Sequence, residues 1–271
     1  MLLDPPLHLR PHHLESLRNL HATYDADPTV LALLLGGSLA HGFAAADADI
    51  DFIAVVTPDE YGRRAAGGLL TRASRDGITY EGGYTDGKFV DVGHLERVAR
   101  YGSEPARFAF QDARVLIERN PAVRPLLVDI VRYPVAGVDD RMERFAAQLL
   151  AWRWYFSQAI EKQSRYLELL SLQKLVLFSC RLVLAANRML YPYHKWMLRL
   201  TELAPKRPAT LTADLERLMR APTTGLVDDH VRALLEFGGF DHDALNARWG
   251  GFFLRDNEQT WMAGCTAVDD L

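Results

Sequence analysis

The chain has 271 residues, of which 49% are hydrophobic and 24% are charged, and its formal net charge is −4. This length corresponds to about two domains, and a composition so close to the globular average excludes disordered and fibrous proteins. The slightly acidic charge argues against binding of long nucleic acid. Two cysteines exclude a disulfide framework and favour the reducing cytoplasm.

The first half of the chain, residues 1–136, alternates between helical and strand-like patterns. Apolar residues recur at helical spacing near the amino terminus, and short apolar runs bounded by turn residues predict strands. The mixture predicts an α+β fold, a mixed sheet with flanking helices. In chain order we expect a helix over 11–25, strands within 29–37 and 50–56, a helix over 59–74, strands within 78–84 and 88–95, a helix from 96, a strand over 113–118 and a helix over 121–131.

One connection in this half is predicted from its turn residues. Asp86-Gly87 separates two strand-like runs, and Asp-Gly in that position is typical of a β-hairpin. We therefore expect Asp86 and Gly87 in a turn between two strands.

From Gly137 onward the pattern is helical only. Asp139 and Asp140 are suited to cap a long helix over 140–170, and a second, largely buried helix is expected over 171–190. Residues 137–271 are therefore predicted to form an all-α helical bundle domain. The inward face of the long helix is marked by Phe145, Leu149, Trp152 and Phe156.

No membrane or export signal is predicted. The amino terminus, MLLDPPLHLRPHH, has an acid and two prolines where a signal peptide has a basic patch and an apolar stretch. The most apolar helical stretch, LVLFSCRLVLAA, carries Arg181 in its middle and is too short to cross a bilayer. We expect a soluble cytoplasmic protein with no membrane partner.

The chemistry-bearing stretch is LLLGGSLAHGFAAADADIDFIAVV, residues 33–56. Side chains at i and i+2 of a strand share a face, so Asp49 and Asp51 point the same way, with Cα atoms about 6.6–7 Å apart. Two carboxylates at that separation are able to bind a pair of divalent cations about 3.5–4 Å apart. The alternative interpretation of Asp49 and Asp51 is an acidic loop that caps a strand. Asp47 is expected to be a loop residue.

A glycine-serine turn precedes these acids. Gly36-Gly37 allows close approach of a ligand to the backbone, and Ser38 with nearby amides is suited to phosphate oxygens. The turn lacks the Gly-Lys-Ser/Thr of a P-loop, and its glycine spacing is not that of a dinucleotide-binding G-x-G-x-x-G site. Phosphoryl and nucleotidyl transfer need both divalent cations and hydrogen-bond donors to the phosphate oxygens.

Gly37-Ser38, followed after ten residues by Asp49-Ile50-Asp51 between two apolar strands, resembles the signature of the polymerase-β-type nucleotidyltransferase superfamily. Its members include aminoglycoside adenylyltransferases and the small nucleotidyltransferases of toxin–antitoxin pairs. The resemblance covers about residues 33–93, and it extends to the helical half only in outline. It implies two Mg²⁺ ions on the paired aspartates, ATP as the nucleotide donor and a triphosphate held by the glycine-serine turn.

The family pattern includes a third carboxylate on a later strand, which completes the metal site or helps to deprotonate the acceptor. The resemblance assigns this role to Asp91 in KFVDV, with Glu81 as the alternative. A basic residue of the helical half lies near the triphosphate in some members, which makes Lys195 a candidate for nucleotide binding, against the alternative of a solvated surface lysine. His8, His12 and His13 lack metal-ligand spacing and are expected at the surface.

The primary hypothesis is a Mg²⁺-dependent enzyme that moves AMP from ATP onto a hydroxyl or phosphate of a small-molecule acceptor, with release of pyrophosphate. The alternatives are AMP transfer to a protein, as in toxin neutralisation, and a catalytically silent nucleotide-binding module. A third reading is a helical scaffold with an acidic loop. The acceptor, the preferred base and the oligomeric state, including a homodimer, stay open at this stage.

Overall fold

The structure is a computed structural model that describes residues 9–261 and Val268. The chain divides into two compact units, one made of Met1–Gly102 and Ala106–Arg132, and the other of Ser103–Pro105 and Tyr133–Leu271. The expected boundary at 136/137 lies four residues beyond the last residue of the first unit. The short segment around Glu104, however, belongs to the second unit, which sequence patterns did not indicate.

The first unit is an α+β fold around a mixed five-stranded sheet with the strand order β3-β4-β2-β1-β5. β1 runs antiparallel to β2 and β5, β2 runs parallel to β4, and β3 runs antiparallel to β4. The strands are β1 (Val30–Leu35), β2 (Ile50–Val56), β3 (Thr71–Ser74), β4 (Thr85–Val90) and β5 (Arg114–Glu118). The helices are α1 (Pro11–Asp25), α2 (Gly37–His41), α3 (Pro58–Ala66), α4 (Val92–Tyr101), α5 (Glu104–Phe108, whose first two residues belong to the second unit) and α6 (Val123–Ile130).

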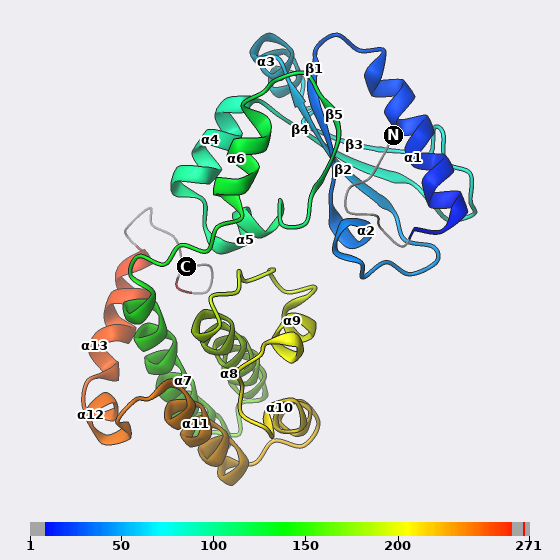
Figure 1. The fold of residues 1–271 in the computed structure, drawn as a ribbon. Helices are drawn as coiled ribbons and strands as arrows, with labels where there is room; N and C mark the ends of the chain where they lie inside the picture. The colour runs from blue at the N-terminus through cyan, green and yellow to red at the C-terminus, as the bar shows by residue number, and fades with distance from the viewer. Residues whose placement is uncertain (1–8, 262–267, 269–271) are drawn as a thin grey trace. The chain divides into compact units, whose positions relative to one another are not determined.

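Helices cover both faces of the sheet (Figure 1). On one face, α1 packs through Leu17 and Leu20 against alternate residues of β2 such as Phe52. On the other face, α4 and α6 pack against the intervening residues, such as Ile53 and Val55. Because side chains alternate along a strand, Asp49 and Asp51 share the face of Ile53 and Val55.

The predicted hairpin at Asp86-Gly87 is wrong, because both residues lie inside β4. The glycine serves packing here: a Cβ on Gly87 would lie 2.1 Å from Cζ of Phe52. The strand that pairs antiparallel with β4 is instead β3, which occupies the end of the segment 59–74 predicted as one helix. α3 ends earlier, at Ala66, before the Gly67-Gly68 pair.

The described residues of the second unit form helices and no strands, as predicted. Phe145, Leu149, Trp152 and Phe156 of α7 are all buried, and α7 packs along α8, α11 and α13. The expected helix over 140–170 is divided, because Gln163 adopts a positive φ of 52°. The helices are α7 (Val138–Glu161), α8 (Arg165–Ala186), α9 (Met197–Leu203), α10 (Leu211–Arg220), α11 (Thr224–Gly238), α12 (His242–Asn246) and α13 (Trp249–Phe253), followed by a π-helical turn (Leu254–Glu258) and a 3-10 turn (Gln259–Trp261).

The apolar helix α8 is longer than its most apolar stretch. By length and composition alone it is able to cross a membrane, which corrects the expectation that it is too short, but 72% of its apolar window is buried within the fold. Its central Arg181 lies 3.5 Å from the buried carboxylate of Glu104 and stacks over the rings of Phe145 and Tyr191. Burial raises the pKa of Glu104, and the nearby Arg181 opposes that rise. α8 packs against α7, α9, α10 and α11.

Candidate active site at the amino ends of two parallel strands

Three carboxylates lie on one face of the sheet where β2 and β4 run side by side. Asp51 in β2 pairs in register with Asp86 in β4. Paired residues of neighbouring parallel strands share a face, and such strands are about 4.8 Å apart, so these two side chains emerge next to each other. Asp49 directly precedes β2, and continuation of the strand by one residue would place its side chain on the same face as that of Asp51. All three are half-buried.

The hydroxyl of Tyr84 indicates how closely these charges are grouped. It donates a hydrogen bond to Asp49, and this bond is the largest cause of a raised pKa for Tyr84. The negative charges of Asp49, Asp86 and Asp51 all contribute to the same rise. The three carboxylates thus create one region of negative potential, which a cation would stabilise.

The glycine-serine turn packs directly against this cluster. The amide of Gly36 donates to the carbonyl oxygen of Asp51 at 2.9 Å. Gly37 has a φ of +60°, and a Cβ at this position would lie only 1.7 Å from Oδ2 of Asp51. Both the backbone conformation and the missing side chain at Gly37 are therefore required for the observed position of the Asp51 carboxylate.

Ser38 lies at the start of α2 with its hydroxyl unsatisfied. Its side chain is 6% exposed, and Oγ is buried without a hydrogen-bond partner. A buried hydroxyl without a partner costs about 1–3 kcal/mol. An acceptor oxygen from a bound ligand would satisfy it, and a phosphate oxygen has this property.

The loop that leads into Asp49 is fixed by aromatic side chains. The hydroxyl of Tyr80 donates to the carbonyl oxygen of Ala48 at 2.6 Å, and Nε2 of His12 lies 2.9 Å from the carbonyl oxygen of Ala46. His13 packs against the rings of both Tyr80 and His12. Its burial corrects the expectation of a surface residue, and that burial lowers the pKa of His13. His8 lies outside the described residues.

Asp91 does not lie with Asp49 and Asp51. It follows β4 by one residue and caps α4, where its Oδ1 accepts a hydrogen bond from the amide of His94 at 2.6 Å and lies 3.5 Å from Arg97. Five residues of parallel strand, about 16 Å, separate it from Asp86. Its proposed role in the metal site is therefore corrected: Asp91 starts a helix.

Glu81, the alternative candidate for the third carboxylate, is exposed in a turn before β4 and is on no strand. Asp86 is not predicted as a site residue from the sequence, because an Asp-Gly pair is typical of a hairpin turn. Thr85, Phe89 and Val90 in the run Thr85–Val90 are residue types that favour strands, and they were the signal for a strand through Asp86.

Lys195 belongs to the second unit, where it is exposed in the turn before α9. Its ammonium group lies 5.3 Å from the centre of the Trp196 ring. Its role in nucleotide binding stays a prediction.

Within the part of the chain that the structure describes, no group of three or more His, Cys, Asp or Glu side chains is gathered closely enough to hold a metal ion by itself. This is compatible with Mg²⁺, which uses one or two protein carboxylates, water molecules and the phosphates of the substrate rather than a cage of protein ligands. Asp49, Asp51 and Asp86 supply only oxygen atoms, the donors that Mg²⁺ prefers.

Comparison with known proteins assigns no family to this chain. The chain matches no protein-family model and no curated protein. Among solved structures it is similar to a nucleotidyltransferase-like protein from Exiguobacterium sibiricum 255-15, with 11% sequence identity, a TM-score of 0.46, and coverage of 90% of this chain and 79% of that one. The assignment of residues to chemistry rests on the site geometry.

Proposed function

We propose that the first unit is a nucleotidyltransferase, and that it moves AMP from ATP onto an acceptor with pyrophosphate as the leaving group. The observation that carries this proposal is the register pairing of Asp51 with Asp86, beside Asp49 and against the Gly37 turn. The carboxylates would bind cations, and the hydroxyl of Ser38 would donate to a phosphate oxygen. The site therefore fits a triphosphate with its bound cations better than it fits a free cation or a free anion.

Asp49, Asp51 and Asp86 would hold Mg²⁺, which when bound neutralises phosphate charge and polarises the reacting phosphorus–oxygen bonds. Ser38 would donate its hydroxyl proton to a phosphate oxygen and orient the triphosphate. The acceptor oxygen attacks the α-phosphorus while the bond from that phosphorus to the β-phosphate oxygen breaks. Asp86 is the carboxylate that we assign to receive the proton of the acceptor hydroxyl.

The acceptor is proposed to be a small molecule. The net charge of −4 and the acidic site disfavour a polyanionic acceptor, since nucleic acid needs an extended basic surface. A protein acceptor and a silent nucleotide-binding module are the competing outcomes of the test.

The test is transfer of label from α-labelled ATP, with Mg²⁺ and cell extract, by wild type and by Asp51→Ala, Asp86→Ala and Asp47→Ala. Asp47 is the matched control, because it is an exposed loop acid whose loss removes the same charge two residues before Asp49. We expect label in the small-molecule fraction for wild type and Asp47→Ala only. Label on a protein band would favour the protein acceptor.

ATP binding without release of pyrophosphate would favour the silent module. Equal transfer by wild type and Asp51→Ala would refute the proposed function.

A further inference from the structure

The second unit contains two adjoining cavities between α8, α9 and α10. The larger one has a volume of about 700 Å³, and eight of its eleven lining residues are leucine, valine or methionine. The smaller one has a volume of about 120 Å³ and shares Leu198 and Met219 with the larger one. Small-molecule sites typically have volumes of about 300–1,000 Å³, mostly apolar walls and a few polar groups that fix orientation. The two cavities together therefore have the size and the lining of a ligand site.

Lys174, the lysine in the lining of the larger cavity, directs its charge elsewhere. Its ammonium group lies over the ring of Trp152, 5.9 Å from the ring centre, and Trp152 does not line the cavity. The other two polar residues of this lining, Gln173 and His194, are exposed to solvent, and Nδ1 of His194 lies 3.2 Å from the hydroxyl of Tyr191. The larger cavity therefore fits the apolar body of a ligand rather than a charged head group.

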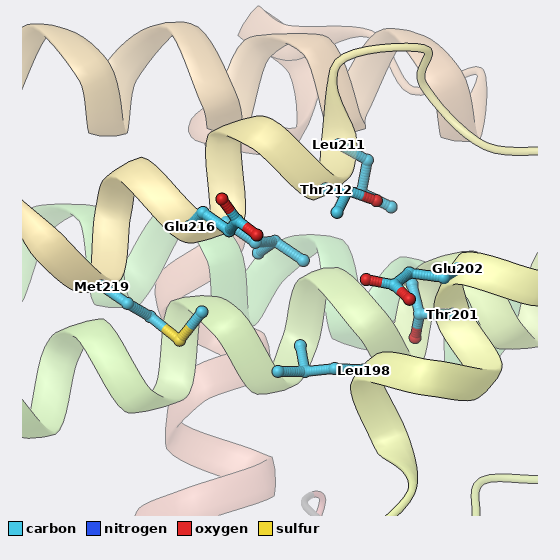
Figure 2. A pocket seen from close by; sticks show the side chains of 8 residues that line it. Leu198, Thr201, Glu202, Leu211, Thr212, Glu216 and Met219 are labelled. Carbon is cyan, nitrogen blue, oxygen red and sulfur yellow. The ribbon is translucent and has the colours of Figure 1, made fainter.

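The smaller cavity has a negatively charged lining. Glu202 of α9 and Glu216 of α10 face this space from opposite walls (Figure 2). Among the residues that the structure describes, neither carboxylate has an ion-pair or hydrogen-bond partner, whereas Asp214 on α10 is paired with Arg217. Carboxylates stabilise a nearby positive charge, and hydrogen bonds between charged groups are stronger than neutral ones. The smaller cavity therefore complements a cationic group that donates hydrogen bonds.

Helical spacing places both acids next to the larger cavity. Glu202 lies four residues after Leu198 on α9, and Glu216 lies three residues before Met219 on α10. Residues three or four apart on a helix are neighbours on one face, with Cβ atoms about 5–6 Å apart. Because Leu198 and Met219 line both cavities, each acid lies one helical turn from the apolar wall. One ligand is therefore able to contact the apolar wall and both carboxylates.

We propose that the two cavities together bind one molecule of a cationic amphiphile, a primary amine with an alkyl chain. The chain would lie against the apolar walls, where Leu169 and Met219 are 46% and 51% exposed and would be removed from water. Methionine suits such a wall because its flexible thioether adapts to chains of differing shape. The ammonium group would lie at Glu202 and Glu216, since its three N–H donors are able to serve both carboxylates. This site is independent of the proposed nucleotidyl transfer.

The experiment is calorimetric titration of the full chain at neutral pH with decylammonium, decanol and decanoate, each at concentrations where it is dissolved as single molecules. The probes share one alkyl chain and carry a positive, a zero and a negative charge. We expect saturable one-to-one binding of decylammonium, and binding of decanoate about tenfold weaker or worse, because the two carboxylates attract one head group and repel the other. No saturable binding of decylammonium, uptake of several molecules per chain, or equal binding of decanoate would overturn the proposal.

Three variants locate the head group and the chain of the ligand. The double variant Glu202→Gln/Glu216→Gln keeps the side-chain shapes and removes both charges, so it should weaken decylammonium binding about tenfold and leave decanol binding unchanged. Glu236→Gln is the control, because Glu236 is an exposed acid of α11 that lines neither cavity. Leu169→Ser removes apolar wall and should weaken decylammonium and decanol alike.

Equal weakening by the double variant and the control, or unchanged binding by Leu169→Ser, would contradict the assignment. A second copy of the chain is the alternative occupant of the apolar wall. If light scattering shows that wild type is a dimer and Leu169→Ser is a monomer, the wall is an interface between two copies and the proposal is wrong.

Discussion

The contact between Gly37 and Asp51 allows a sharp test of the site. In a Gly37→Ala variant the new Cβ would lie 1.7 Å from Oδ2 of Asp51, whereas real Cβ atoms essentially never come within 3.0 Å of another atom. The Asp51 carboxylate must therefore move by more than about 1 Å, and a displacement of about 1 Å at a reacting centre costs roughly a hundredfold in rate. The positive φ adds about 1–2 kcal/mol of backbone strain.

Gly42 provides the matched control at the other end of the same short helix. It also has a positive φ, of +72°, but a Cβ there would meet nothing within 4 Å. Gly42→Ala should therefore lose a similar 1–2 kcal/mol or so of stability in urea denaturation and keep its rate of label transfer from α-labelled ATP. If both alanine variants transfer label equally well, the Asp51 carboxylate is not part of the reacting centre.

Three further predictions use other parts of the chain. Asp86→Asn should lower AMP transfer about a hundredfold or more, whereas Asp91→Ala should leave transfer unchanged and lower stability by about 1 kcal/mol through loss of a helix cap; the reverse pattern would restore Asp91 to the site. Burial lowers the pKa of His230 to about 4 from an ordinary 6.5; the unfolded chain binds the proton first, so stability should fall by roughly 3 kcal/mol as the pH drops through that range, and a His230→Gln variant that shows the same loss in denaturation curves would disprove this cause. Glu104→Ala should cost about 3–5 kcal/mol because it removes the buried carboxylate that lies 3.5 Å from the guanidinium of Arg181. Asp139→Ala, which breaks an exposed ion pair, should cost less than about 1 kcal/mol in the same urea titration.

Local patterns predicted most of the elements. The helix over 11–25, the strand over 50–56 and the inward face of α7 follow from hydrophobic periodicity, which depends only on residues near in sequence. The errors fall where tertiary packing overrides a local signal. Asp86-Gly87 has turn chemistry but lies in a strand, because Phe52 from the neighbouring strand occupies the space beside Gly87.

The same distinction applies to the site. Gly37, Ser38, Asp49 and Asp51 are close in sequence, so their spacing alone was enough to predict that they lie together, because one strand, one turn and the next strand bring them to one end of the sheet. The third carboxylate comes from a strand more than thirty residues later, and its identity depends on the register of β4 against β2. Register is set by the packing of both sheet faces, so only the folded chain places Asp86, and not Asp91, beside Asp51.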